Sequence, residues 1–149
     1  MSNNILITCF SKEHIKPVAE IESICFSSPW SDNSLENELQ NPISFFVVAL
    51  INENVAGYGS FRNICGLGFI NNIATHPSFR KLGVASAIME CLEENAKSHD
   101  VEYLTLEVRQ SNVPAIALYE KFGFINLGIR KNFYTKPEEN ALILTKYYK

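Results

Sequence analysis

The chain has 149 residues, of which 46% are hydrophobic and 19% are charged, and its formal net charge is −3. A chain of this length is expected to form one domain, residues 1–149, around one buried core. The slight acidity and the lack of a dense Lys and Arg cluster argue against duplex DNA or RNA as a partner.

Membrane insertion and export are not expected either. The longest uncharged apolar run, residues 43–51, is much shorter than the roughly 18 residues that cross a bilayer. The amino-terminal segment lacks a basic stretch leading into an apolar one. We therefore expect a cytoplasmic protein that makes no contact with a membrane.

Four cysteines and three histidines are spread along the chain without the spacing typical of a zinc site or a disulfide scaffold. We expect reduced thiols, packed as small hydrophobic side chains, and no metal site. The cysteines are Cys9, Cys25, Cys65 and Cys91.

The first half of the chain predicts one strand, two helices and three further strands. The first helix carries Val18, Ile21, Ile24 and Cys25 on its buried face. The second helix ends before Pro42, because proline disfavours a helical residue in front of it. The predicted elements are a strand at 5–10, a helix from residue 12 that ends near residues 27–29, a helix at about 31–40, and strands at 43–51, 55–61 and 69–75.

The second half predicts helix, strand, helix and two closing strands. In the strand at 101–108, Leu104, Leu106 and Val108 share one face, while Glu107 lies on the other. The remaining elements are helices at 83–97 and 112–122 and strands at 124–130 and 141–147, which flank a polar turn at 136–140. This order predicts a mixed α/β sheet with helices on both faces.

The turn before the helix at 83–97 is the most informative segment. Arg80 and Lys81 precede a helix start, where unpaired N–H groups and the positive end of the dipole favour anionic oxygens. Gly83 and Ala85 leave space for a pyrophosphate to approach the backbone. An ordinary helix with a basic first turn is the alternative, although cationic side chains there oppose the dipole. The spacing fits neither GxxxxGK[ST] nor GxGxxG, so ATP and NAD are poor candidates.

Residues 80–85, Arg-Lys-Leu-Gly-Val-Ala, resemble the [Q/R]-x-x-G-x-[G/A] signature of the GNAT superfamily of N-acetyltransferases, which binds the pyrophosphate of acetyl-CoA. Segments 26–31, 72–74, 106–112 and 117–124 are similar to its ribosomal-protein-alanine (RimI-type) branch. The resemblance implies a mainly antiparallel GNAT-like sheet and acetyl-CoA as co-substrate. It also implies acetyl transfer to a protein N-terminal α-amine, with the N-terminal alanine of a small-subunit ribosomal protein as the branch-implied acceptor.

Two side chains are candidates for the chemistry. Glu107 ends its strand where open α/β sheets bind ligands, and Tyr119 lies on the following helix. By resemblance, Glu107 matches the proton acceptor and Tyr119 the proton donor to the CoA sulfur. A partly dry cleft would make the glutamate a better base. The alternatives are a solvated strand end or an ion pair with Arg109 for Glu107, and a core aromatic for Tyr119.

The resemblance also assigns cofactor contacts, although Asn112 is equally well explained as an ordinary helix N-cap. Two residues depart from the pattern: Phe69 stands where the branch often has an acidic residue, and Ala85 replaces the commoner second glycine. The assigned cofactor residues are Ile73, Ala74, Thr75, Arg80, Lys81, Leu82, Gly83, Val84, Ala85, Ser86 and Asn112.

Other interpretations remain open from the sequence. Trp30, Phe133 and Tyr134 are candidates either for the acceptor groove or for core and lid packing. A GNAT enzyme for a small amine, such as a polyamine, an amino acid or an antibiotic, is the nearest alternative function. A non-catalytic acyl-CoA-binding regulator is the alternative from another class.

Overall fold

The computed structural model describes residues 4–149. The expectation that the amino-terminal segment is no export signal rests partly on residues 1–3, which lie outside the described residues. The elements follow the predicted order. They are β1 (Leu6–Cys9), η1 (Lys12–His14), α1 (Ile15–Cys25), α2 (Asp32–Leu39), β2 (Ser44–Ile51), β3 (Asn54–Ile64), β4 (Leu67–Thr75), η2 (Pro77–Phe79), α3 (Val84–Ser98), β5 (Tyr103–Arg109), α4 (Val113–Lys121), β6 (Ile125–Thr135) and β7 (Glu138–Tyr147).

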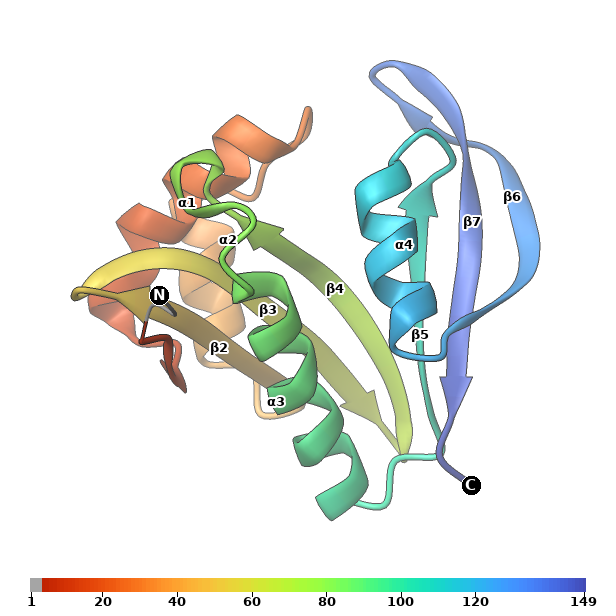
Figure 1. The fold of residues 1–149 in the computed structure, drawn as a ribbon, viewed down its shortest axis with the longest axis horizontal. Coiled ribbons are helices and arrows are strands. Elements are labelled where there is room, and N and C mark those ends of the chain that lie inside the picture. Colours follow the sequence, from red (N-terminus) through yellow and green to blue (C-terminus); the bar gives the residue numbers. More distant parts are fainter. Residues whose placement is uncertain (1–3) are drawn as a thin grey trace.

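The strands form one seven-stranded mixed sheet in the order β1-β2-β3-β4-β5-β7-β6. All neighbouring strands are antiparallel except β4 and β5, which are parallel and pair only between residues 67–69 and 103–105. Beyond that short contact the two strands diverge, so the sheet is split toward their carboxyl ends (Figure 1). The predicted mixed, mainly antiparallel sheet is confirmed.

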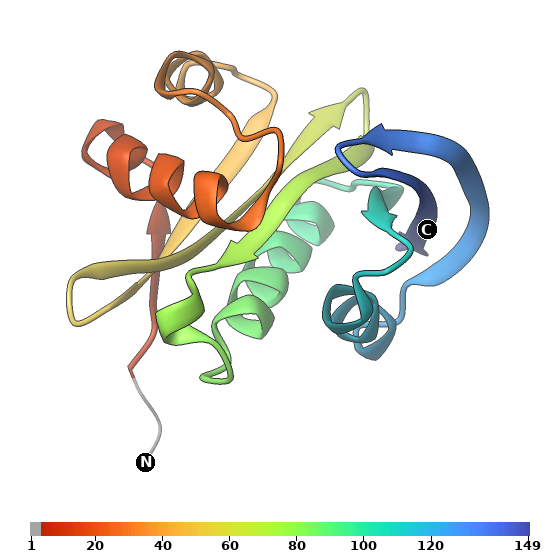
Figure 2. The same cartoon turned by 90° about the horizontal axis from the view of Figure 1, so that it is seen from above.

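Helices cover both faces of this sheet, as predicted. α1 and α2 lie on one side, and α3 and α4 lie on the other (Figure 2). α3 packs closely on β3 because glycine leaves room there: a Cβ at Gly59 would lie 2.4 Å from Cγ2 of Ile88. The two buried clusters therefore sit on opposite faces of the sheet.

The buried face of α1 differs from the prediction. Ile24 is 49% exposed, whereas Glu22 is only 1% exposed beside Val18 and Ile21. Residues 18, 21, 22 and 25 follow the i, i+3, i+4, i+7 spacing of one helical face, so geometry favours Glu22 over Ile24. A carboxylate is rarely buried unless it is hydrogen-bonded, and Glu22 has such partners in the site described below.

The closing strands are longer than predicted. β6 runs to Thr135 and β7 begins at Glu138, which reduces the expected turn at 136–140 to residues 136–137. Register shifts at 126–128 and 130–134 let β6 carry extra residues while it remains paired with β7. Such bulges interrupt the alternating pattern from which strand ends are predicted.

The expectation of buried thiols is wrong for two of the four cysteines. All four are free, as expected, but Cys9 and Cys65 are exposed, while Cys25 and Cys91 are half-buried. Cys65 stands in the β3–β4 turn with φ of 52°, where its side chain has no core to enter.

Candidate active site

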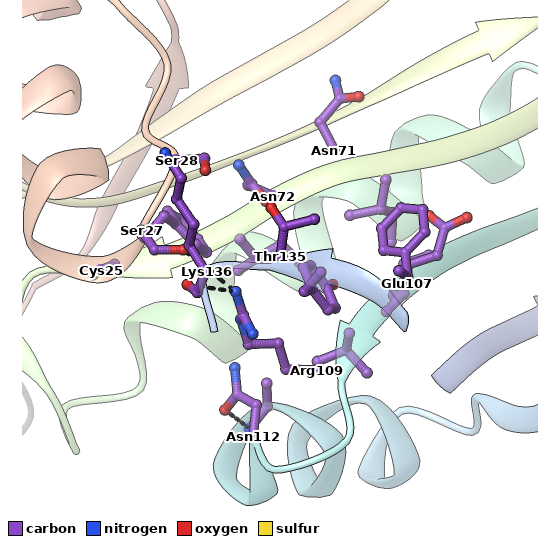
Figure 3. Close-up of a pocket in the computed structure, with 18 of the residues that line it drawn as sticks. Cys25, Ser27, Ser28, Asn71, Asn72, Glu107, Arg109, Asn112, Thr135 and Lys136 are labelled. Carbon is purple, nitrogen blue, oxygen red and sulfur yellow. Dashed lines mark hydrogen bonds between the residues drawn. The ribbon is translucent and has the colours of Figure 1, made fainter. Parts of the chain in front are cut away.

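A cavity of about 510 Å³ lies where β4 and β5 diverge (Figure 3). Its walls come from β4, β5 and α4, from the segment that ends α1, and from the end of β6 with the following turn. Glu107, Tyr119, Ile73 and Asn112, all predicted site residues, line it together. The split in the sheet thus brings residues from separate parts of the chain to one place.

A β-bulge shapes the β4 wall. Ser60 pairs with Asn72 and the next residue of β3 pairs with Ile70, which leaves Asn71 as the extra residue. Both asparagines turn toward the α1–α2 side: Nδ2 of Asn71 lies 3.2 Å from Oγ of Ser60, and Nδ2 of Asn72 lies 3.0 Å from a carboxylate oxygen of Glu22. Because β4 pairs with β5 only as far as residue 69, the backbone of residues 70–73 borders the cavity without a strand partner on that side.

Glu22 supports this wall from the buried side. It accepts hydrogen bonds from the backbone N–H of Trp30 (2.8 Å), from Nδ2 of Asn72 (3.0 Å) and from the hydroxyl of Tyr58. Burial raises the pKa of Glu22, and the bonds from Trp30 and Asn72 oppose that rise. The residue was missed because sequence reasoning discounts a charged residue on an apolar helix face.

The aromatic candidates separate into two groups. Trp30 packs against the buried cluster around α1 and does not line the cavity, which favours the interpretation that it is a packing residue. Phe133 and Tyr134, at the end of β6, do line the cavity. Their rings meet edge to face with centroids 5.0 Å apart, so they form one wall.

Glu107 lies on β5 and faces the cavity from its open side. Its side chain is 34% exposed, and its Oε1 lies 3.5 Å from Nε of Arg130. The carboxylate is thus partly shielded from solvent and partly open to it. The ion pair with Arg109, considered from the sequence, is not formed, because Arg109 pairs with Glu139 at 3.2 Å. A carboxylate reachable by solvent and substrate is what the structure provides.

Tyr119 reaches the cavity from α4 and is only 5% exposed. Its ring packs against Phe124 with centroids 5.7 Å apart. Burial raises the pKa of the Tyr119 phenol far above its usual range, with a smaller contribution from Tyr134. Like an ordinary tyrosine, whose pKa is about 10, Tyr119 is protonated at neutral pH, and its side chain is therefore available as a donor in the cavity.

The start of α3 has the features of an anion site. Its N-cap, Gly83, has φ of 87°, provides no side-chain cap, and is followed by a first turn without an acidic residue. The first helical hydrogen bond runs from Ala87 N to Gly83 O, so the preceding N–H groups lack helical partners. A Cβ at Gly83 would have nothing within 4 Å, and Arg80 and Lys81 are exposed beside it.

The predicted cofactor residues do not all line the cavity. Asn112 caps α4, accepting from Ala115 N at 3.3 Å, which confirms its N-cap reading. Ala74 is buried on the α1 side, whereas Ile73 lines the cavity. The segment 80–86 precedes and begins α3 and is not part of the cavity wall. A ligand that contacts both places must therefore be elongated.

Two kinds of site are not found in the described part of the chain. Residues 4–149 contain no group of three or more His, Cys, Asp or Glu side chains that would hold a metal ion. No helix within the same range is long and apolar enough to cross a membrane.

The structure thus combines a split sheet, a helix start without a side-chain cap, and a cavity lined by Glu107 and Tyr119. Residues 15–124 match the Acetyltransferase (GNAT) family. The chain belongs to this family and is an acetyl-CoA-dependent acetyltransferase.

Several relatives are named for one acceptor. A protein of Bacillus subtilis (strain 168) is 40% identical over 133 residues, covering 89% of this chain and 88% of the relative, and its name assigns it provisionally to N-acetylation of the alanine of ribosomal protein bS18. The [ribosomal protein bS18]-alanine N-acetyltransferase of Escherichia coli (strain K12) is 32% identical over 127 residues, covering 83% and 84%. The crystal structure of the ribosomal-protein-S18-alanine N-acetyltransferase from Escherichia coli superposes with a TM-score of 0.88 at 28% identity, covering 97% of this chain and 94% of that one.

Proposed function

We propose that this protein transfers the acetyl group of acetyl-CoA to the N-terminal α-amine of a protein, the alanine of ribosomal protein bS18, and that residues 1–149 act as one acetyltransferase domain. The observation that carries the proposal is that Glu107 of β5 and the buried Tyr119 of α4 line the same cavity. The names of the relatives support the acceptor. A ribosomal acceptor would place the enzyme in the cytoplasm.

The residues present fit acetyl-CoA, which supplies an acyl group activated as a thioester. The uncapped N–H groups at the start of α3, with Arg80 and Lys81 beside them, suit its pyrophosphate. The unpaired backbone edge of β4 beside the cavity suits the pantetheine arm and the thioester carbonyl. We assign these contacts to Ile73, Ala74, Thr75, Arg80, Lys81, Leu82, Gly83, Val84, Ala85, Ser86 and Asn112.

Glu107 takes the proton that the attacking amine must lose, directly or through a water. A peptide α-amine, with a pKa of about 7.7–8.0, is already partly neutral near physiological pH, whereas a lysine side chain near 10.4 is not. A solvent-reachable carboxylate in an ion pair with Arg130 meets the smaller of these two demands. This supports an α-amine over a polyamine as acceptor.

Tyr119 has the complementary role. Its side chain lines the cavity from α4 and its hydroxyl is protonated at neutral pH, so we assign it as the donor to the sulfur that departs as the acetyl group is transferred. The two groups sit on different elements, so each is held independently of the other. Acyl transfer from a thioester to an amine requires a proton acceptor for the amine and a proton donor for the thiolate, and this assignment supplies both.

The test is CoA release with an alanine-ended basic peptide and with a panel of polyamines and amino acids. We expect Glu107→Gln and Tyr119→Phe each to lower kcat about 10²–10⁴-fold. Matched controls are Glu120→Gln on the exposed side of α4 and Tyr148→Phe, whose hydroxyl bonds Glu93 outside the cavity. These two should keep wild-type turnover.

Each other result has a definite meaning. Wild-type activity in both Glu107→Gln and Tyr119→Phe would overturn the assigned roles. Turnover of a small amine without turnover of the peptide would identify a small-molecule acetyltransferase. Tight acetyl-CoA binding without turnover of any amine would instead identify an acyl-CoA-binding regulator.

A further inference from the structure

Arg109, the last residue of β5, is a hub between segments that are far apart in the sequence. Its Nη1 lies 2.9 Å from the carbonyl oxygen of Pro137 and 3.2 Å from Oε1 of Glu139. Its Nη2 lies 3.0 Å from the carbonyl oxygen of Lys136 and 3.3 Å from Oγ of Ser27 (Figure 3). One guanidinium thus joins the β6–β7 turn to the segment that follows α1.

These contacts occupy the side chain almost completely. A guanidinium has five N–H groups, and the four contacts of Arg109 direct four of them at protein oxygens. Its plane also stacks on Tyr134, with the guanidinium carbon 4.2 Å from the ring centroid. Arg109 has little capacity left for a substrate, although it lines the cavity, so its role is to hold other residues.

The joined segments form the same side of the cavity. Ser27 follows α1, which covers the face of the sheet opposite α3, and Tyr134, Lys136 and Pro137 close the cavity from the end of β6. The start of α3 does not line this cavity, although the guanidinium of Arg80 comes within 4.0 Å of Sγ of Cys25 at the end of α1. None of the four contacts of Arg109 involves residues 80–86, so we expect Arg109 to organise this cavity wall and to leave the start of α3 unchanged.

Glu139 extends the hub to α4. Its Oε1 pairs with Arg109, while its Oε2 accepts the backbone N–H of Ser111 at 2.5 Å, directly before the α4 N-cap. The hydrogen bond from Ser111 is the main reason that the pKa of Glu139 lies below its usual range, and the pairing with Arg109 lowers this pKa further. The start of β7, the end of β5 and the start of α4 are thereby tied together.

We propose that Arg109 is the positioning residue for the acceptor, because its planar fork fixes the 26–28 segment and the β6–β7 turn against each other as one wall of the acceptor groove. The inference rests on the proposed function only for the identity of the acceptor. A lysine carries the same charge but cannot reach both segments with a rigid fork, so Arg109→Lys removes the positioning and keeps the charge.

The test compares Michaelis constants in the full-length protein. We expect Arg109→Lys to raise the KM for an alanine-ended peptide at least ~10-fold, while the KM for acetyl-CoA stays within about 3-fold. Ser27→Ala, which removes one arm, should raise the peptide KM about 3-fold and have no further effect in the Arg109→Lys background. Additive effects of the two changes would show that Ser27 does not act through Arg109.

A structural control separates positioning from stability. Lys146→Met breaks the ion pair of Lys146 with Glu93 (2.7 Å), outside the cavity, and should lower Tm without changing the peptide KM. Amide hydrogen exchange in residues 26–28 and 133–137 should accelerate in Arg109→Lys but not in Lys146→Met. If Arg109→Lys behaves like Lys146→Met in both measurements, the positioning role is refuted. If the wild-type protein does not acetylate the peptide, the proposed function fails, and the exchange measurement alone then decides the role of Arg109.

Discussion

Two glycines of this chain allow the anion site to be tested apart from backbone strain. Gly83 at the start of α3 and Gly66 in the β3–β4 turn both have φ of 87°, and a Cβ at either would meet nothing within 4 Å. An alanine in this left-handed conformation costs about 1–2 kcal/mol at either position. Gly83→Ala and Gly66→Ala should therefore lower Tm by similar amounts, roughly 2–4 °C per kcal/mol.

Only Gly83→Ala should impair acetyl-CoA binding. The added methyl group and the shifted N–H groups would weaken at least one charge-assisted hydrogen bond, worth about 1.5–3 kcal/mol, and so raise Kd about 10-fold or more. Thermal shift with acetyl-CoA at about 100 times the wild-type Kd measures this, because that concentration stabilises the wild-type protein by about 2.7 kcal/mol and a variant with tenfold weaker binding by about 1.4 kcal/mol. Equal stabilisation of the two alanine variants by acetyl-CoA would refute the anion site at α3.

Three further predictions concern buried groups. Burial raises the pKa of Glu22, so ionisation of this carboxyl should lower the free energy of unfolding as the pH rises from the ordinary glutamate pKa through the raised pKa of Glu22. Glu22→Gln should lack this decline when urea unfolding is followed between pH 4 and 8. Burial opposes ionisation of Glu38, yet the hydrogen bonds from Arg62 hold the pKa of Glu38 below its usual value, so this pair stabilises the fold above the ordinary glutamate pKa and the effect is lost in acid. Arg62→Met should therefore lower the unfolding free energy by about 2–3 kcal/mol at pH 7 and by less at pH 3, and an equal loss at both values would contradict the ion pair. Gly57→Ala should cost about 1–3 kcal/mol in thermal unfolding, because its Cβ would lie 2.6 Å from the backbone oxygen of Ala74, which cannot move aside; a variant as stable as the wild-type protein would show that α3 and β3 readjust.

Features encoded by neighbouring residues were predicted well. The order of helices and strands follows from periods of 2 and 3.6 residues and from breakers such as Pro42 and Gly123, and the structure has that order. The N-cap role of Asn112 also depends on a contact three residues away and was found in advance. The ends of the β6–β7 hairpin were not, because bulges near 126–128 and 130–134 change the register between strands.

Features that depend on distant partners were missed. Glu22 can be buried because Tyr58 on β3 and Asn72 on β4 donate hydrogen bonds to its carboxylate. No residue near Glu22 in the sequence indicates these partners. The ion-pair partner of Glu107 was missed for the same reason: Arg130 comes from β6, at the far edge of the sheet, whereas the sequence suggested the nearby Arg109.

The sequence by itself determined the order of the elements, since that order depends on local spacing and residue chemistry, and it predicted an anion site around Gly83. Together with the family resemblance, it also selected Glu107 and Tyr119 as candidate groups. The tertiary structure decided that the last two share one cavity, because β4 and β5 pair over only three residues before they diverge. It also decided that Arg109 is a hub, because only the packing of the sheet brings residues 27 and 136–139 to one guanidinium. A contact between distant parts of the chain requires the strand order and register, which no local pattern contains.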